Sequence, residues 1–165
     1  MKYGFIGCGN MGGALIRALS KKTNDIMIAD FYLEKAQALA EELNLKWGTN
    51  DEIALTCDRI FLAVKPQMME KVVTEIKDIL EDRKPTLITI AAGLEIKKIE
   101  TFAGGNIPVI RIMPNTPVLV EKGMLLYDVA GVSKEDENAF LAAFAKAGIL
   151  DKLPEEKIDA ASALS

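Results

Sequence analysis

The chain has 165 residues, of which 50% are hydrophobic and 27% are charged, a composition typical of one globular domain with a buried core. A net charge of −4 and a pI of about 5.0 argue against a nucleic-acid-binding surface and a basic membrane-binding patch. Two cysteines and no histidine argue against a disulfide framework, a metal site and the common Ser–His or Cys–His nucleophile pairs.

Strand and helix patterns alternate from the N-terminus. The predicted strands are short apolar runs, and the predicted helices carry apolar residues at helical spacing. Thr49, followed three residues later by Glu52, indicates a capping box for a short helix. In the helix after Pro66, we expect Met68 and Met69 to pack in the core and not to form part of a site. In chain order the elements are a strand at 2–6, helix 10–22, strand 26–30, helix 33–43, the short capped helix, strand 59–64 and helix 67–80.

The alternation continues to the C-terminus. Ser133 is predicted to cap a helix that runs to Lys146 and is ended by Gly148. The remaining elements are a strand at 86–91, a short helix at 95–102, strands at 109–113 and 124–129, and a last helix that begins at Pro154.

The predicted strands are continuous apolar runs, which is typical of a parallel sheet covered on both faces. We therefore expect an α/β fold with a Rossmann-like, doubly wound, mostly parallel sheet, helices on both faces and the strand 2–6 at its centre. The N-terminus lacks the long apolar segment of a signal peptide, and no apolar run reaches the ~18 residues of a membrane helix. We expect a cytoplasmic protein with no membrane or nucleic-acid partner.

The segment "GFIGCGNMGGAL" carries the pattern G-x-G-x-x-G at Gly7, Gly9 and Gly12, between the first strand and the first helix. The first glycine allows a tight turn, the second lets a pyrophosphate approach the backbone, and the third lets the helix pack on the strand. The phosphates would meet the unpaired N–H groups of the helix N-terminus. The context predicts dinucleotide binding.

Asp30 ends the second strand, 18 residues after Gly12. An acid there binds the adenosine ribose hydroxyls and opposes a 2′-phosphate, which favours NADH over NADPH. Alternatively, Asp30 only starts the turn into the next helix as its N-cap.

Ligands of a doubly wound sheet lie across the carboxyl ends of the strands. The residues expected at those ends are small, kinked or polar, and each proline or glycine among them could also simply terminate a strand. They are Ala63-Val64-Lys65-Pro66, Ala91-Ala92-Gly93 and Met113-Pro114-Asn115-Thr116-Pro117.

Four motifs in this order resemble pyrroline-5-carboxylate reductase, the last enzyme of proline synthesis: "FIGCGNMG" at 5–12, "FLAVKPQ" at 61–67, "ITIAAGL" at 88–94 and "VIRIMPNTP" at 109–117. The resemblance covers essentially the whole chain and includes "IDAASALS" at 158–165, which is similar to the start of that family's inter-domain helix. It implies an N-terminal domain that binds NADPH or NADH.

By position, the resemblance assigns cofactor-binding roles to thirteen residues, in addition to the role that its place after the second strand predicts for Asp30. Gly7, Gly9, Asn10, Met11 and Gly12 would contact the pyrophosphate, and Asn50 would lie near the adenosine ribose. Ala63, Val64, Lys65 and Pro66 would line the cofactor groove, and Ala92, Gly93 and Asn115 would lie towards the nicotinamide. The family often uses NADPH, and Asp30 departs from its serine- or arginine-containing versions.

The implied reaction is hydride transfer from the nicotinamide to the C=N carbon of the cyclic imine 1-pyrroline-5-carboxylate, which gives L-proline. A protonated imine already accepts hydride well, so the absence of histidine is compatible with this reaction. The residue sequence identifies no catalytic residue. A reductase of another imine or of a hydroxyacid, and a non-enzymatic NAD(P) sensor, remain alternatives.

The end of the chain suggests a domain boundary. Ile158, Ala161 and Leu164 begin an apolar stripe that no helix-stop signal closes. We expect residues 1–153 to form the dinucleotide-binding domain and residues 154–165 to start a helix that leads to an absent C-terminal helical domain. In the family that domain supplies the homo-oligomer interface and most of the substrate pocket, so we expect this chain alone to be inactive, with a frayed last helix.

Overall fold

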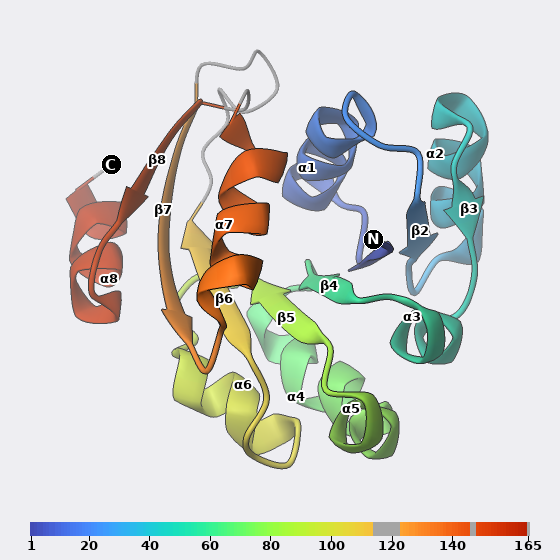
Figure 1. Cartoon of the computed structure of the whole chain (residues 1–165). Helices are drawn as coiled ribbons and strands as arrows, with labels where there is room; N and C mark the ends of the chain where they lie inside the picture. Colours follow the sequence, from blue (N-terminus) through green and yellow to red (C-terminus); the bar gives the residue numbers. More distant parts are fainter. Residues whose placement is uncertain (114–122, 146–147, 165) are drawn as a thin grey trace.

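A computed structural model describes residues 1–113, 123–145 and 148–164. These residues form an eight-stranded sheet with helices on both faces (Figure 1). The strands are β1 (Tyr3–Ile6), β2 (Ile26–Ala29), β3 (Lys46–Trp47), β4 (Arg59–Leu62), β5 (Thr86–Thr89), β6 (Val109–Met113), β7 (Gly123–Ala130) and β8 (Gly148–Lys152). The helices are α1 (Asn10–Ser20), α2 (Leu33–Leu43), α3 (Asn50–Thr56), α4 (Pro66–Glu75), α5 (Lys77–Arg83), α6 (Ile96–Phe102), α7 (Lys134–Ala143) and α8 (Glu155–Leu164).

The strand order is β3-β2-β1-β4-β5-β6-β7-β8. Strands β1 to β6 all run parallel to one another. Strand β7 pairs antiparallel with β6, and β8 pairs parallel with β7. The expected fold class is therefore confirmed, with β1 between β2 and β4 at the point where the chain reverses its direction of winding.

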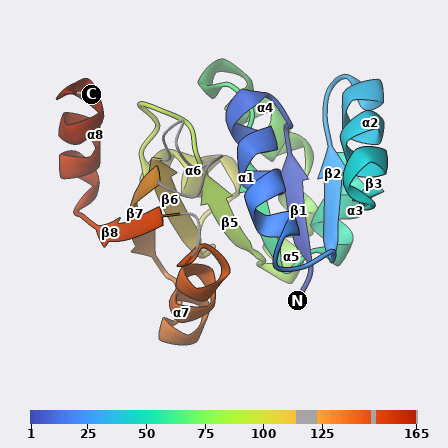
Figure 2. The same ribbon diagram turned by 90° about the horizontal axis from the view of Figure 1, so that it is seen from above.

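Two hydrophobic clusters lie on opposite faces of the sheet. On one face, side chains such as Phe5, Phe61 and Ile110 pack against α1, α2 and α7. On the other face, alternate side chains such as Leu62 and Leu87 pack against α3, α4, α5 and α6. Every residue of β1, β4 and β5 is buried, which explains why these strands read as continuous apolar runs. Figure 2 shows α8 at the opposite end of the sheet from α2.

Two predicted helices differ from those observed. The helix expected over 67–80 is two helices, because the backbone turns at Ile76, where φ is −107° and ψ is 10°. Ile76 is itself buried in the core, so the apolar stripe continues through the break and the spacing did not reveal it. The helix capped by Ser133 ends at Ala143, and Gly148 begins β8 and does not end the helix.

Sequence reasoning missed β3 and β8. Strand β3 has only two residues, and both are exposed, so it carries no apolar run. Strand β8, "GILDK", is half polar and lies at the far edge of the sheet. The capping box of α3 is confirmed, since the side chains and backbones of Thr49 and Glu52 make both reciprocal hydrogen bonds.

The last helix begins against the sheet. Ile158 is 0% exposed, and α8 contacts β6 and β7. The first half of α8 is therefore packed, and fraying of this helix stays a prediction. No helix among the described residues has the length and apolar character needed to cross a bilayer.

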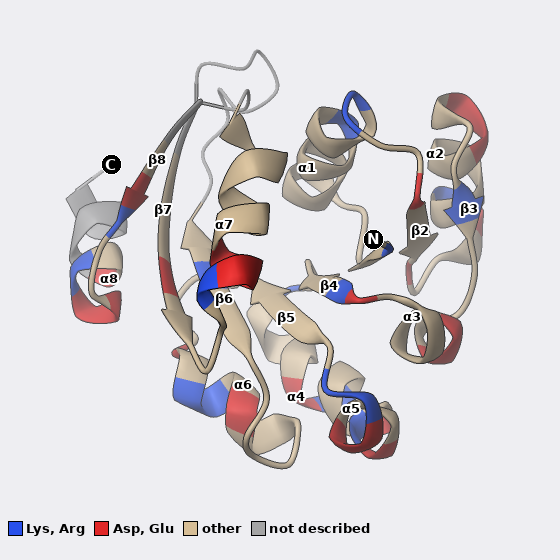
Figure 3. Ribbon diagram, in the orientation of Figure 1, with Lys and Arg blue, Asp and Glu red and all other residues tan. Residues whose placement is uncertain are grey.

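Charged positions of both signs are interspersed over the described helices and loops, whereas β5 has none (Figure 3). Two arginines, Arg59 on β4 and Arg111 on β6, are buried exceptions within the inner strands.

Candidate functional site

The strand register aligns the end of β1 with the ends of its neighbours. Ile6 pairs with Ala29 on one side and Leu62 on the other, and Leu62 pairs with Thr89. The loops that follow these four residues therefore leave the sheet along one edge, the carboxyl edge, where doubly wound folds bind their ligands. Gly7, Asp30, Ala63 and the segment from Ile90 onwards all begin there.

Two glycines of the loop after β1 are required by the packing. Gly7 has φ +102°, and a Cβ there would lie 2.6 Å from the carbonyl oxygen of Ala63. A Cβ at Gly12 would lie 2.7 Å from the carbonyl oxygen of Gly7 and 3.0 Å from the Ala63 side chain. The first and third glycines of the fingerprint therefore let β1, α1 and the end of β4 pack closely.

The second glycine has a different environment. A Cβ at Gly9 would have no atom within 4 Å, so this position faces open space. Gly9 is the N-cap of α1, no side chain caps this helix end, and the first turn has no acidic residue. The unpaired N–H groups and the positive end of the α1 dipole are therefore available to an anionic group in front of Gly9.

A cleft of about 650 Å³ opens between the glycine loop, the end of β2 and α4. This size suits a small-molecule or cofactor site, since such pockets are typically about 300–1,000 Å³. Seven of the predicted site residues line it: Gly7, Gly9, Asp30, Asn50, Ala63, Val64 and Lys65. The lining also includes residues without a predicted role: Ile6, Phe31, Tyr32, Lys35, Gln67, Met68, Lys71, Val72 and Glu75.

The other predicted residues lie around the cleft or outside the described residues. Asn10, Met11 and Gly12 form the first turn of α1, and Pro66 begins α4. Ala92 and Gly93 follow β5 at the same edge of the sheet and are exposed, but they do not line the cleft. Asn115 lies outside the described residues. Met69 is buried in the core as expected, whereas Met68 is half-buried at the cleft.

Asp30 connects two loops of the site. Its Oδ2 atom accepts the backbone N–H of Cys8 at 2.9 Å, and its Oδ1 atom accepts the N–H of Tyr32 at 2.9 Å. The N-cap of α2 is Tyr32, so Asp30 is not the N-cap, although it does start the turn two residues earlier. Asp30 holds the glycine loop to the end of β2 and also lines the cleft.

Cys8 lies within the glycine loop but is not a reactive thiol. Burial, the negative charge of Asp30 and the hydrogen bond that its thiol donates to this carboxylate raise the pKa of Cys8 to about 12. The thiol is therefore neutral at physiological pH. Among the described residues, no group of three or more Cys, Asp or Glu side chains could hold a metal ion.

Two aromatic rings stand at the rim of the cleft. Phe31 is 82% exposed, and its ring packs edge-on against Tyr32 with the centroids 5.2 Å apart. The ammonium group of Lys35 lies 5.4 Å from the centre of the Tyr32 ring. These exposed rings offer a stacking surface for a planar group. Their position directly after Asp30 is the sequence signal that could have identified them.

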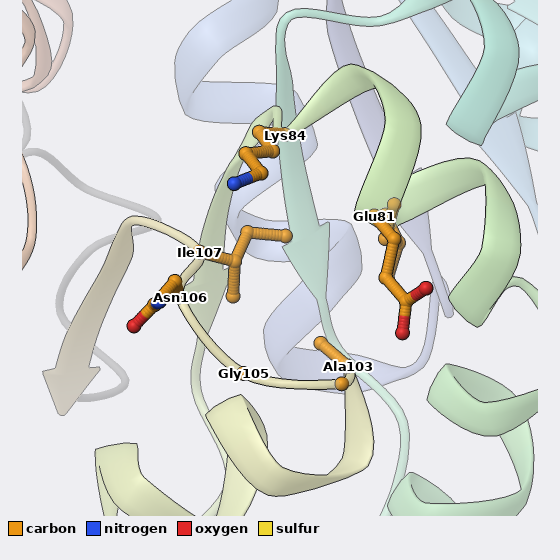
Figure 4. A pocket seen from close by; sticks show the side chains of 8 residues that line it. Glu81, Lys84, Ala103, Gly105, Asn106 and Ile107 are labelled. Carbon is orange, nitrogen blue, oxygen red and sulfur yellow. The ribbon is translucent and has the colours of Figure 1, made fainter.

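A smaller hollow of about 270 Å³ lies between α5 and the turn after α6 (Figure 4). Lys84 precedes β5 and Ile107 precedes β6, so this hollow is at the amino ends of the strands. Ligands of open α/β sheets bind at the opposite edge, and the candidate site is therefore the larger cleft.

Comparison with known proteins places the same region in a family. Residues 2–93 match the family model described as "NADP oxidoreductase coenzyme F420-dependent". Pyrroline-5-carboxylate reductase of Aquifex aeolicus is 31% identical over 100% of this chain and 62% of its own length. The Escherichia coli enzyme of that name is 38% identical over 74% of this chain and 47% of its own length.

A solved structure agrees with these sequence matches. Pyrroline carboxylate reductase of Plasmodium falciparum, with NADP bound, superposes with a TM-score of 0.87 at 31% identity, covering 100% of this chain and 62% of that one. The chain thus spans about three fifths of the length of the relatives that it matches throughout. With its glycine loop, its strand order and matches along the whole chain, this chain belongs to the NADP oxidoreductase, coenzyme F420-dependent family and corresponds to the N-terminal NAD(P)-binding domain of pyrroline-5-carboxylate reductases.

Proposed function

We propose that the cleft binds NAD(P)H and that this chain is the cofactor-binding part of a reductase that reduces 1-pyrroline-5-carboxylate to L-proline. The observation that carries the proposal is the open space in front of Gly9, at the uncapped N-terminus of α1, within a cleft of about 650 Å³. This arrangement suits a pyrophosphate, because the backbone N–H groups can donate to it without a side chain in the way.

The rest of the cleft suits the adenosine end of the cofactor. Asp30 and Asn50 offer polar atoms to the ribose, and the exposed ring of Phe31 offers a surface on which adenine can stack. Lys35, Lys65 and Lys71 add positive charge around the phosphates. The carboxylate of Asp30 disfavours a 2′-phosphate, whereas the Plasmodium relative has NADP bound. Both NADH and NADPH are therefore proposed as cofactors.

The nicotinamide supplies the hydride, and the task of this chain is to bind and orient the cofactor. We place its nicotinamide end towards Ala92 and Gly93, which follow β5 at the same edge of the sheet. In the longer relatives, the region beyond the boundary that corresponds to Pro154 would form the substrate pocket and the oligomer interface. This division at 153/154 is part of the proposal.

The first experiment is a titration of cofactor fluorescence. A valine at position 9 would fill the space proposed for the pyrophosphate, so Gly9→Val should abolish binding of NADH and NADPH while the circular dichroism spectrum stays unchanged. Gly13→Ala is the control, because its added Cβ would make only an ordinary contact at 3.7 Å with the Cys8 carbonyl. Unchanged affinity in Gly9→Val would remove the glycine loop from the proposal.

The second experiment follows cofactor oxidation in the presence of the cyclic imine. This chain alone should bind the cofactor without turnover, because the substrate is not held in place. A version extended by about a hundred further residues of the gene should turn over. Turnover by the shorter chain would refute the division of labour, and silence from both chains would favour a non-enzymatic NAD(P) sensor.

A further inference from the structure

A buried charged cluster joins β6 to the last helix. The guanidinium group of Arg111 is 0% exposed, and its Nη1 atom donates to Oε1 of Glu155 at 2.9 Å and to Oδ2 of Asp159 at 3.3 Å. Its Nη2 atom also forms an ion pair with Asp159. Glu155 and Asp159 stand one turn apart on α8, so both carboxylates face the same guanidinium.

Glu155 makes a second contact, with the start of α6. Its Oε1 atom also accepts the backbone N–H of Ile96, the first residue of that helix. The N-cap residue of α6, Glu95, makes no side-chain capping hydrogen bond. A carboxylate 59 positions away in the sequence therefore takes the role of the cap, and one oxygen atom joins β6, α6 and α8.

The loop between β5 and α6 is held at one end by the pairing of β5 with β6 and at the other end by Glu155 of the cluster. Thr89, the last residue of β5, pairs with Arg111 across the sheet, and Ile96 is bound by Glu155. Between them lie Ala92 and Gly93, which are exposed, and Gly93 has φ +75° with open space around its Cα. Ala91 and Leu94 on either side pack against the core, so the position of the two exposed residues depends on how the residues that flank them are held.

We propose that Glu155, Arg111 and Asp159 are positioning residues that let the docking of α8 set the geometry of the nicotinamide end of the cofactor site. The inference rests on the proposed cofactor function and adds that the cofactor site is coupled to the helix that leads out of the domain. A shift of α8 would displace Glu155, release the N-terminus of α6 and move the loop that carries Ala92 and Gly93.

The adenine side of the site should not feel this change. Asp30, Phe31 and the glycine loop lie at the other end of the row of strands, next to β1 and β2, and none of them contacts Arg111 or α8 among the hydrogen bonds and ion pairs of the described residues. Loss of Glu155 should therefore weaken only the contribution of the nicotinamide half to binding.

The test compares two ligands on the 165-residue chain by calorimetry. One is the reduced cofactor that the chain binds, and the other is its adenine-side fragment: ADP-ribose for NADH, or 2′-phospho-ADP-ribose for NADPH. Glu155→Ala should leave the affinity for the fragment unchanged. It should lower the ratio of cofactor affinity to fragment affinity roughly three- to tenfold, the equivalent of about one hydrogen bond. Asp159→Asn, which keeps both contacts of Glu155, should lower the ratio by less.

Two control variants separate positioning from stability. Glu156→Ala removes an exposed carboxylate one residue further along α8 and should leave the ratio unchanged. Glu137→Gln disrupts the hydrogen bonds of buried Glu137 with Tyr127 and Lys152, on the side of the sheet covered by α7, and reports the effect of destabilisation alone.

The outcomes are distinct. If the unaltered chain binds neither ligand, the proposed function falls and this inference falls with it. If it binds both, and Glu155→Ala gives the same ratio as Glu156→Ala or Glu137→Gln, the positioning role is refuted while cofactor binding stands. Should Glu155→Ala fail to fold, a ratio in Asp159→Asn equal to that of the unaltered chain would refute the inference.

Discussion

The glycine loop after β1 and the charged cluster between β6 and α8 both adjoin the carboxyl ends of parallel strands, but different interactions shape them. In the glycine loop, backbone atoms of Gly7, Gly12 and Ala63 pack so closely that no side chain fits. In the cluster, Arg111 depends on two carboxylates that lie more than forty positions later in the chain. Close packing of backbone atoms, including those of Ala63 at the end of β4, shapes the loop, whereas the cluster requires matched charges on β6 and α8.

Contacts of buried charged side chains also occur on the opposite face of the sheet, beneath α7. Arg59, 2% exposed, forms an ion pair with Asp136 of α7 at 2.8 Å and lies over the ring of Tyr3. Nearby, buried Glu137 accepts a hydrogen bond from the hydroxyl of Tyr127 and forms an ion pair with Lys152. Burial and the carboxylate of Glu137 raise the pKa of Tyr127 to about 12, so the hydroxyl stays protonated as a donor. The C-terminal part of the domain is thus attached through polar contacts of buried side chains, although in the described part of the chain Nε of Arg59 and Nε of Arg111 have no hydrogen-bond partner.

If this contrast is correct, the largest stability effect should come from the ion pair of buried Arg59. Asp136→Asn leaves the Arg59 guanidinium buried without its counter-charge, and the free energy of unfolding should fall by about 3 kcal/mol. This is the lower end of the range for a broken buried pair, because Asp136 is itself 37% exposed and Tyr3 remains beside Arg59. Urea denaturation would measure the change. Glu135→Gln, which removes an exposed charge from the same helical turn, should change it little. Equal effects in the two variants would show that burial of Arg59 does not matter.

The glycine loop should respond to the position of a methyl group. Gly7→Ala places a side chain at positive φ and against the Ala63 carbonyl, so it should lower the free energy of unfolding by about 2 kcal/mol. Gly9→Ala adds the same methyl group in open space and should cost less than about 1 kcal/mol. Thermal unfolding of both variants makes the comparison. Similar losses would mean that loop flexibility, rather than close packing, selects glycine.

The smallest effect concerns the choice of cofactor. Asp30→Ser removes a carboxylate that opposes a 2′-phosphate. The ratio of NADPH to NADH affinity should rise roughly fivefold or more, which corresponds to a difference in binding free energy of about 1 kcal/mol or more. Only the ratio is informative, because serine also weakens the link to Cys8 and Tyr32. Asp58→Ser is the control, since Asp58 also accepts a backbone N–H, from Lys2, but at the amino edge of the sheet. An unchanged ratio would restrict Asp30 to holding the two loops together.

Part of the site was predictable because local patterns specify it. The fingerprint at Gly7, Gly9 and Gly12 has a fixed spacing, and the apolar run before it and the helical spacing after it place it in a strand–turn–helix unit. Lys65 was predicted from its place at the end of a strand and from a family motif, and Asn50 from its position in the family resemblance; the structure brings both to the same cleft as the glycine loop. Phe31 and Met68 were missed, because an aromatic or thioether side chain in a sequence does not show whether it faces the core or a cleft.

The sequence by itself therefore determined the α/β class, the glycine loop and the alternation of buried strands, because these depend on periodicity and on residues close together in the chain. Only the tertiary structure decided the helix break at Ile76 and the edge strands β3 and β8. It also decided the hydrogen bond from the Cys8 N–H to Asp30 and the pairing of Arg111 with Glu155 and Asp159. Each of these depends on which distant segment packs alongside. A charged residue has no periodic signature, and its partner is set by the register of the sheet and by the helix that docks on it.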